Sequence, residues 1–410
     1  MSPYPSQISV DEAIELVCSK TPMGPPERVP IDLALGRTLA KRLASRADHP
    51  TVDNSAMDGF ACRMVDTAEA SEDDPAILAV VGEVPAGRPY QRSVGLGEAV
   101  RIYTGGAVPC GADAIVPVEV TRERAGRVEV LEPARRNHIR PKAQDLKAGR
   151  SYLEPGTRLD SASIGLVAAM GHATLSVVRK PRVGILATGS EVVAPGGTLK
   201  PGQVFNANAY SVAALVHAAG GEPVHLPLVP DDAGALEGVI GENLGLDLLL
   251  TSGGVSMGRY DLVRDLLLDG GEVFFWKVAM RPGGPVMFGR WRGLPILGLP
   301  GNPVSSVVVF LLLGRAFLDT FLGRSDPLPY HRRVKAQAGQ TFRASGAKET
   351  FQRVRILRHA GSAVAITTGN QSSGVLRSMV EADALAILPG GTEVAEGDDL
   401  EVIPLHPHLG

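Results

Sequence analysis

The stretch LDLLLTSGGVSMGRYD, residues 246–261, joins a short apolar run to a glycine-rich loop. Four strand-like runs of this kind cover residues 183–187, 224–229, 247–251 and 273–278. Helix-like stretches alternate with them, at residues 207–219, 233–243, 261–268 and 304–321. Such alternation is typical of βαβ crossover units. It predicts an α/β domain whose mostly parallel sheet is covered by helices on both faces.

Glycine-rich or polar loops follow the predicted strands. They read ATGSE (187–191), LVPDD (228–232), TSGGVSMGRYD (251–261), KVAMRPGGP (277–285) and LPGNP (299–303). Glycines let backbone N–H groups approach an oxyanion, and a following helix N-terminus adds partial positive charge. A single loop of this kind is also what an ordinary turn needs. Because several converge on the sheet edge where ligands bind, they favour a site for a phosphate-like anion.

Carboxylates stand in the same loops. Glu191, Asp231 and Asp261 follow three different strands. Carboxylates facing an anionic ligand repel it unless a divalent cation lies between them, so we expect a hard, oxygen-liganded ion such as Mg²⁺. Helix capping is the alternative for Asp261 and for its counterpart Asp232.

Two cations, Lys277 and Arg281, lie four residues apart around a strand exit. Solvated surface charge is the ordinary interpretation of such residues. The RPGGP turn that begins at Arg281 favours a second interpretation, in which both supply positive charge to the anion site.

Three further regions flank the α/β unit. The chain starts with a helix that Ser9 caps, with Glu12 completing a capping box. Short β-prone runs between Gly and Pro predict an inserted β-rich domain, and after the α/β unit the helical period gives way to strands of a small β-barrel or sandwich. The expected domains are 1–50 with 146–178 (N-terminal), 51–145 (inserted), 179–326 (α/β) and 327–410 (C-terminal).

Composition excludes several classes of protein. The 410 residues are 44% hydrophobic and 21% charged, which suits a globular chain of several domains. A net charge of −3 gives no broad attraction to nucleic acid or anionic lipid. No apolar run approaches the roughly 20 residues that cross a bilayer. The start resembles no secretory signal, and three cysteines without a CxxC pair (Cys18, Cys62, Cys110) fit a reducing cytosol.

Standard nucleotide motifs are missing. The chain has no G-x-G-x-x-G, and its nearest P-loop imitation, residues 106–111, lacks the lysine. Gly254, Ser256 and Gly258 match the G-x-S-x-G of serine hydrolases, with His331 and His359 downstream. Because Ser256 lies behind a Gly-Gly pair rather than at the strand end, a flexible loop fits better, and a serine hydrolase stays a remote alternative.

Six segments together resemble the molybdopterin molybdenumtransferase family, whose eukaryotic relatives include the E domain of gephyrin. The resemblance covers essentially the whole chain, in order, and NSAMDG and GLPGNPVS are its most specific parts. The segments are VDNSAMDGFA (52–61), RIYTGGAVPCGADAIVPVE (101–119), ATGSE (187–191), TSGGVSMGRYD (251–261), FWKVAMRPGGP (275–285) and GLPGNPVS (298–305).

The resemblance implies a reaction and an assembly. Such enzymes take adenylylated molybdopterin and molybdate and, with Mg²⁺, release AMP while placing molybdenum on the dithiolene. They are cytoplasmic homodimers of elongated, multidomain subunits, with the active site between the α/β domain of one subunit and N-terminal segments of the other. A transient contact with molybdopterin adenylyltransferase, and no nucleic acid or membrane partner, is expected.

The resemblance also assigns residues. Asp58, for which turn chemistry alone predicts only local hydrogen bonds, becomes the first candidate for an acid/base or activating role. The expected catalytic residues are Asp58, Thr104, Asp145, Glu191, Asp231, Asp261, Lys277 and Arg281, and Glu191, Asp231 and Asp261 are the expected metal ligands. The expected substrate-binding residues are Ser252, Gly253, Gly254, Ser256, Pro300, Gly301, Asn302, Pro303, Arg353 and Ser373.

Two positions depart from the family pattern. The family often has Lys where Arg281 stands, and usually Lys rather than Gly at Gly284. We therefore expect fewer ammonium groups at the anion site. Two rival functions stay open, a molybdopterin adenylyltransferase with a similar TSGG loop and a non-catalytic scaffold on the same fold.

Overall fold

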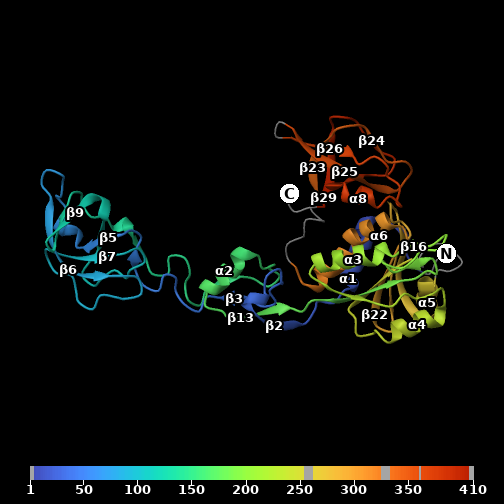
Figure 1. Ribbon diagram of the computed structural model, residues 1–410, viewed down its shortest axis with the longest axis horizontal. Coiled ribbons are helices and arrows are strands. Elements are labelled where there is room, and N and C mark those ends of the chain that lie inside the picture. The colour runs from blue at the N-terminus through green and yellow to red at the C-terminus, as the bar shows by residue number, and fades with distance from the viewer. Residues whose placement is uncertain (1–3, 254–261, 325–332, 360–361, 406–410) are drawn as a thin grey trace.

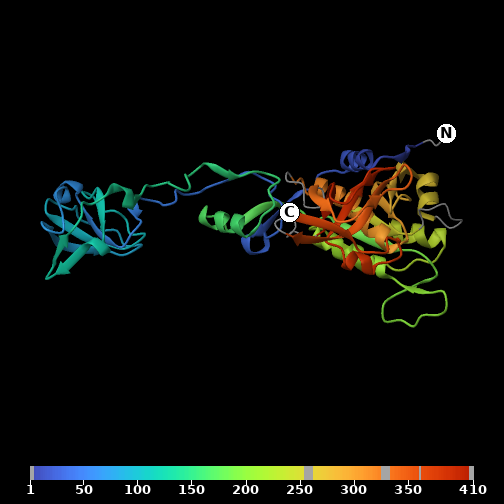
Figure 2. The ribbon, with the colours of Figure 1, turned by 90° about the horizontal axis from the view of Figure 1, so that it is seen from above.

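The computed structural model describes residues 4–253, 262–324, 333–359 and 362–405. The molecule is elongated (Figure 1): the inserted β-rich domain lies at one end and the α/β and C-terminal domains at the other. A small middle domain lies between them. Two extended chain segments run side by side and connect the middle domain to the inserted domain (Figure 2).

The α/β domain is built on a seven-stranded sheet in the order β1-β19-β21-β22-β18-β14-β17. Its pairs are parallel except β19/β21 and β21/β22, so the predicted mostly parallel sheet is confirmed. The hairpin of β21 and β22 was not among the predicted strands. The strands are β1 (Ser6–Ile8), β14 (Arg182–Ala187), β17 (Glu222–His225), β18 (Leu248–Ser252), β19 (Gly271–Val278), β21 (Met287–Trp291) and β22 (Leu294–Leu299).

Helices cover both faces of this sheet, as predicted. α4 (Ala233–Gly241) and α5 (Leu262–Gly270) share one hydrophobic core with one face. α3 (Ala207–Ala218) packs on the other face with a continuous helical run. That run consists of α6 (Pro303–Val309), the π-helical turn η5 (Phe310–Gly314) and α7 (Arg315–Phe321).

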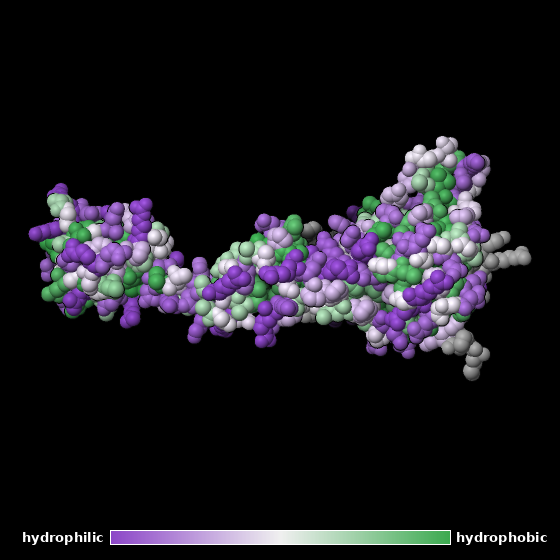
Figure 3. Space-filling view, turned by 90° about the horizontal axis from the view of Figure 1, so that it is seen from below, coloured by the Kyte–Doolittle hydropathy of each residue, from purple (hydrophilic) through white to green (hydrophobic). Residues whose placement is uncertain are grey.

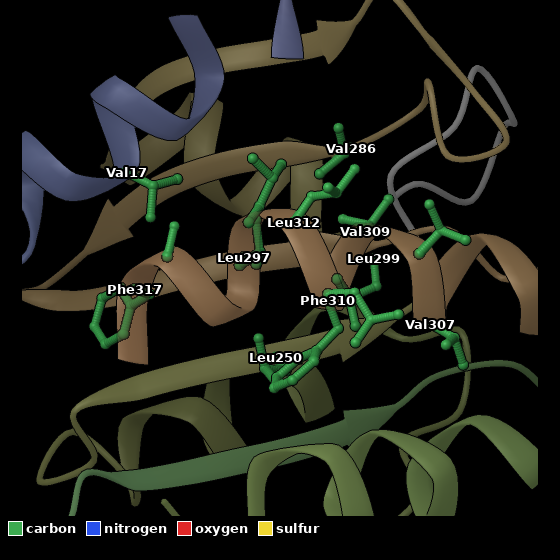
Figure 4. Close-up of a cluster of buried hydrophobic side chains, with 14 of the residues drawn as sticks. Val17, Leu250, Val286, Leu297, Leu299, Val307, Val309, Phe310, Leu312 and Phe317 are labelled. Carbon is green, nitrogen blue, oxygen red and sulfur yellow. The ribbon is translucent and has the colours of Figure 1, made fainter. Parts of the chain in front are cut away.

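The sequence led us to expect no apolar run of membrane-spanning length, and this is corrected by the helical run from Pro303 to Phe321, which is long and apolar enough by length and composition. Of its most apolar window, 89% is buried inside the protein. Figure 4 shows Phe310 and Leu312 of this run beside Leu250 and Leu297 of the sheet. Removal of these side chains from water stabilises the domain, at roughly 25 cal/mol per Å² of apolar surface. Burial in the domain core therefore accounts for the apolar composition of this run.

The first elements of the chain pack on the α/β domain. β1 pairs with β19, and α1 (Val10–Lys20) places Val10, Ala13 and Val17 in the core beside the sheet. The predicted capping box of Ser9 and Glu12 is present. The structure thus separates residues 6–20 from the N-terminal unit to which the sequence assigned them, because the apolar face of α1 is covered by α7 and η5.

The middle domain is made from two separate chain segments. Its core contains Leu159, Val167, Leu175 and Val177. Its elements are β2 (Pro26–Pro30) paired with β13 (Thr174–Val178), β3 (Leu43–Ala44) paired with β12 (Ser151–Leu153), and α2 (Ser161–Ala169).

The inserted domain carries a six-stranded sheet in the order β8-β5-β7-β6-β10-β9. The chain enters and leaves it beside the short pair β4 (Asn54–Ser55) and β11 (Ile139–Arg140). The six strands are β5 (Gly59–Cys62), β6 (Ala76–Val84), β7 (Glu98–Ile102), β8 (Ala114–Pro117), β9 (Thr121–Arg124) and β10 (Arg127–Val130).

The C-terminal domain is a closed barrel, because β25 pairs with both β26 and β27 and the remaining strands complete the circle. The barrel prediction is confirmed. β25 also pairs with β20 (Met280–Arg281), which joins the barrel to the α/β domain. The barrel strands are β23 (Val334–Ala338), β25 (Glu349–His359), β26 (Ser362–Thr367), β27 (Ala384–Leu388) and β29 (Asp399–Pro404).

Short elements complete the described chain. The remaining strands and α-helix are β15 (Val192–Val193), β16 (Val204–Phe205), β24 (Phe342–Arg343), β28 (Glu393–Val394) and α8 (Arg377–Val380). The 3₁₀ turns are η1 (Ile31–Leu33), η2 (Met64–Thr67), η3 (Val118–Val120) and η4 (Arg136–His138).

Candidate functional site

Four neighbouring parallel strands end at one edge of the α/β sheet. β17, β14, β18 and β22 lie side by side in that order, so the loops after them emerge together. Carboxyl ends of parallel strands are where open α/β sheets bind ligands. The predicted convergence of the ATGSE, LVPDD, TSGG and LPGNP loops therefore has its structural basis in this strand order.

An acidic group forms where the first two of these loops meet. The Ser190 backbone N–H and hydroxyl donate to Asp231 Oδ2, at 3.4 and 3.1 Å, and Glu191 is the next residue. Both Asp231 and Glu191 are exposed. Asp232 instead caps α4, since its Oδ1 accepts from the Ala235 N–H at 2.7 Å.

This donor set fits Mg²⁺, which typically takes one or two protein carboxylates and completes its octahedron with water and phosphate oxygens. Within the described residues no group of three His, Cys, Asp or Glu side chains could hold a metal. A Mg²⁺ ion here would thus be held by Glu191 and Asp231 together with water and substrate oxygens. Asp261, the third expected ligand, lies outside the described residues, as do Gly254, Ser256 and His331.

The next two loops, TSGG and LPGNP, contact each other through small residues. Gly253 has φ +97° and donates its N–H to the Leu299 carbonyl oxygen at 3.1 Å. Asn208 of α3 joins the loops, because its Nδ2 donates to Ser252 Oγ at 2.7 Å and to the Gly301 carbonyl oxygen at 2.8 Å. The carbonyl oxygen of Pro300 accepts from the Ser306 hydroxyl. Ser252, Gly253, Pro300 and Gly301 are therefore brought together as expected.

A pocket of about 1000 Å³ opens between the RPGGP turn of the α/β domain and the C-terminal barrel. Arg281, Asn302, Arg353 and Ser373, which come from four parts of the sequence, all line it. Pro303, the first residue of α6, lies directly after Asn302. The pocket contains four cationic side chains, those of Arg281, Arg343, Lys348 and Arg353, and no carboxylate lines it among the described residues. Such a charge distribution suits an anion.

Arg353 is buried beside this pocket and holds the barrel loop that lines it. Its side chain is 1% exposed, and it donates to Ser378 Oγ at 3.1 Å and to the carbonyl oxygens of Asn370 and Ser372 at 3.3 and 3.1 Å. Burial lowers the pKa of Arg353 to about 10, which leaves it charged at neutral pH. The Ser373 carbonyl in turn accepts from the Val304 N–H at the start of α6. Arg353 thereby ties the barrel loop to the α/β domain.

Lys277 is not among the residues that line this pocket. Its backbone has φ +69°, and its ammonium lies 4.2 Å from the centre of the Trp276 ring, a cation–π geometry. From the sequence, Lys277 and Arg281 are expected to supply charge to the same anion site. In the structure, Arg281 lines the pocket and the Lys277 ammonium lies over the Trp276 ring instead.

Asp58 and Thr104 form a tight pair in the inserted domain. Asp58 Oδ1 accepts from the Thr104 N–H at 2.7 Å and from its hydroxyl at 2.8 Å. The two meet because β5 begins at Gly59 opposite Ile102, near the end of β7. Gly59 is required there, since a Cβ would lie 1.9 Å from the Val116 carbonyl oxygen. The Thr104 N–H, and then its hydroxyl, hold the pKa of Asp58 below its usual range, so the side chain is a carboxylate at neutral pH.

Thr104→Val is expected to raise the pKa of Asp58 towards that of a free aspartate, because the variant loses the hydroxyl donor and keeps the N–H donor. A carbon-detected NMR titration of the side-chain carboxyl would show the shift. Asp160 of the middle domain is the control, because hydrogen bonds from Ser163 lower its pKa and the substitution does not touch them. An unchanged Asp58 titration would show that the hydroxyl contributes nothing to the carboxylate.

Asp145 lies apart from this pair, near the junction with the middle domain. Its N–H donates to the His49 carbonyl oxygen at 3.0 Å, and its side chain is exposed. In the single chain, the inserted domain, which carries Asp58 and Thr104 beside β5 and β7, lies at the opposite end of the molecule from the α/β and C-terminal domains (Figure 1).

Comparison with known proteins agrees with this arrangement. The family model of the MoeA N-terminal region (domain I and II) matches residues 8–171, that of the probable molybdopterin binding domain residues 184–320, and that of the MoeA C-terminal region (domain IV) residues 335–405. Molybdopterin molybdenumtransferase 2 of Mycobacterium tuberculosis is 38% identical over 403 residues, with 96% of this chain and 98% of the relative covered.

The chain belongs to the molybdopterin molybdenumtransferase family. The Bacillus subtilis member is 34% identical over 412 residues, covering 98% of this chain and 95% of its own. The crystal structure of a molybdopterin biosynthesis MoeA protein from Pyrococcus horikoshii superimposes with a TM-score of 0.82 at 32% identity, covering 97% of this chain and 99% of that one. The family is one of transferases in molybdenum cofactor biosynthesis, and the fold expected from the resemblance is confirmed.

Several residues of the candidate site were not predicted from the sequence. Asn208 is the second residue of α3, which Asn206 caps directly after the short strand β16, and the sequence FNAN (205–208) was a usable signal for that helix start. Arg343, Ser345 and Lys348 line the basic pocket from the barrel, and nothing local marks them as pocket residues. Their position depends on how the barrel docks.

Proposed function

We propose that the chain transfers molybdenum from molybdate to adenylylated molybdopterin and releases AMP. One observation carries the proposal beyond family membership: a cation-lined pocket and a carboxylate group both lie among the loops that follow the strands of one α/β sheet. The pocket suits a tetrahedral oxyanion such as molybdate. The carboxylates suit Mg²⁺ bound to the phosphates of the adenylylated pterin.

The cationic and the acidic residues of the site would bind different groups. Arg281, with Asn302 and Ser305 at the start of α6, would orient the oxyanion substrate. Glu191 and Asp231 would hold Mg²⁺, which supplies neutralisation of charge that develops on the leaving AMP phosphate. Ser252, Gly253 and Gly301 offer a close, side-chain-poor surface to the pterin substrate.

Asp58 and Thr104 lie in the inserted domain, far from the rest of the proposed site, so they could act there only from a second copy of the chain. The inserted domain joins the rest of the molecule through a narrow neck (Figure 3), at the far end from the sheet edge. We propose a homodimer in which Asp58 and Thr104 of one subunit complete the site on the other. Asp58, as a carboxylate, would act there as a proton or hydrogen-bond acceptor rather than as an acid.

We also propose a cytoplasmic enzyme that meets the adenylyltransferase making its substrate. The three cysteines, Cys18, Cys62 and Cys110, are all free, which suits a reducing compartment. No observation on the described residues favours the scaffold alternative.

The test is AMP release from adenylylated molybdopterin, measured with and without molybdate. The proposal expects molybdate-dependent AMP release together with molybdenum on the pterin. An adenylyltransferase would instead form the adenylylated pterin from molybdopterin and ATP, and a scaffold would turn over neither substrate. Either result would overturn the proposal.

Glu191→Ala and Asp231→Ala are each expected to raise the Mg²⁺ concentration needed for half-maximal activity by at least about tenfold. Each variant removes one of two carboxylates, that of Asp231, which accepts from Ser190, or that of Glu191, the residue after Ser190. Asp232→Asn is the matched control, because an asparagine still caps α4. Superimposable Mg²⁺ titrations of all three variants and the wild type would contradict the metal assignment.

A further inference from the structure

Asn208 connects two loops of the site through its side-chain amide. Its Nδ2 donates to Ser252 Oγ at 2.7 Å and to the Gly301 carbonyl oxygen at 2.8 Å, and the residue is only 9% exposed. The Gly301 oxygen can only accept, so the NH₂ group of the amide must face it. Because Ser252 ends β18 and Gly301 follows β22, one amide holds the TSGG and LPGNP loops together.

Few other bonds connect these loops once they leave the sheet. Ser252 and Leu299 are the last residues paired between β18 and β22. Past them, the Gly253 N–H donates to the Leu299 carbonyl oxygen at 3.1 Å, and no other backbone hydrogen bond joins the two loops among the described residues. The loops pass close at their glycines, since a Cβ on Gly301 would lie 4.0 Å from Gly253 Cα. The Asn208 amide therefore sets the spacing of the loops at this point.

Half of this amide is unpaired. Asn208 Oδ1 is buried and has no hydrogen-bond partner in the part of the chain that the structure describes. A buried acceptor without a donor destabilises a fold. A side chain that served stability alone would not leave such an acceptor, whereas two donors aimed at two loops suit a positional role.

Both loops carry residues of the proposed site. Gly253 belongs to the surface offered to the pterin, and Asn302, which follows Gly301, lines the basic pocket. The dithiolene and the oxyanion must meet before molybdenum can be transferred, and a small error in the distance between two reacting groups slows their reaction strongly. The spacing that Asn208 sets is thus the spacing between the two substrates.

We propose that Asn208 is a positioning residue for molybdenum transfer, which holds the pterin-binding loop at a fixed distance from the loop that leads to Asn302. The proposal deepens the proposed function and rests on it. Asn208 acts through Ser252 and Gly301 rather than by touching a substrate. Its loss should therefore leave the binding of each substrate nearly unchanged and slow the step in which the two react.

The first test needs no substrate. Asn208→Leu keeps the approximate size of the side chain and removes the unpaired acceptor together with the two donors, so the midpoint of urea unfolding should stay close to that of the wild type. Hydrogen–deuterium exchange of the full-length protein should nevertheless become at least about tenfold faster in residues 252–253 and 300–302. Asn243→Leu is the matched control, because Asn243 Nδ2 donates to the Val239 carbonyl oxygen at 2.8 Å in α4.

The second test is kinetic. In the AMP-release assay with molybdate, Asn208→Leu is expected to lower kcat about 10- to 100-fold. The KM values for adenylylated molybdopterin and for molybdate should each change by less than about threefold. A merely structural defect would instead lower stability or raise both KM values. Asn243→Leu should keep the kcat of the wild type.

The outcomes separate this inference from the proposed function. Unchanged exchange in Asn208→Leu, or an equal rise of loop exchange in Asn243→Leu, would overturn the positional role. A loss of activity in Asn208→Leu that appears only as raised KM values or as a lowered unfolding midpoint would also overturn it. A wild type without AMP release would overturn the proposed function and the inference together, whereas an active wild type with an equally active Asn208→Leu variant would overturn the inference alone.

Discussion

Asp58→Asn is expected to fold normally and to lose molybdenum transfer on the order of 100-fold. The asparagine Oδ1 can still accept from the Thr104 N–H, so the turn before β5 is kept while the negative charge disappears. The side chain is exposed, and its loss creates no cavity in the inserted domain. The rate of AMP release at saturating substrate measures the effect.

Asp113→Asn is the matched control. Asp113 lies in the same domain, is exposed, and also accepts a backbone N–H, that of Met64, at 2.7 Å. A domain-wide structural effect would slow both variants equally. Wild-type activity of Asp58→Asn would remove Asp58 from the reaction.

A mixing experiment decides whether Asp58 acts on the other subunit. Heterodimers of Asp58→Asn with Asp231→Ala would have one intact and one doubly altered site if the sites are shared. At a Mg²⁺ concentration too low to support Asp231→Ala, equal mixing of the two variants should then recover about a quarter of the wild-type rate, since half of the dimers would be mixed and each would have one working site. If each subunit used its own Asp58, mixing would recover nothing.

Asp319→Ala is expected to lower the free energy of unfolding of the α/β domain by about 3–5 kcal/mol. The Asp319 carboxylate accepts from Arg315 Nε at 3.1 Å and from Arg324 Nη1 at 2.8 Å, and both arginine side chains are only 2% exposed. Burial lowers the pKa of Arg324, and Asp319 opposes this effect. Removal of the carboxylate leaves two buried guanidinium groups without their shared counter-charge.

Urea unfolding followed by tryptophan fluorescence is suited to this measurement. The two tryptophans of the chain, Trp276 and Trp291, both lie in strands of the α/β sheet, so the signal reports that domain. Glu237→Ala removes an exposed partner of Arg292 in the same domain and should cost at most about 1 kcal/mol. Equal losses in the two variants would contradict a special role for the buried ion pairs.

The β21/β22 hairpin of the α/β sheet and the position of α1 could not be predicted from the hydrophobic pattern. β21 and β22 are joined by a short turn rather than by a helix, so the rule of alternating strands and helices did not find them. The helix α1 was predicted correctly with its cap, but its domain was not. An amphipathic face reveals that a helix is buried, and it does not reveal against which element.

By itself, the sequence determined the elements and their chemistry: the alternation that builds the α/β sheet, the cap at Ser9, and the glycine-rich loops at its strand ends. These depend on interactions within a few residues or on the period of apolar side chains. Only the tertiary structure decided that Asn208 joins Ser252 to Gly301 and that Asp58 meets Thr104. Contacts between residues dozens of positions apart depend on how whole segments pack, and no local preference encodes that geometry.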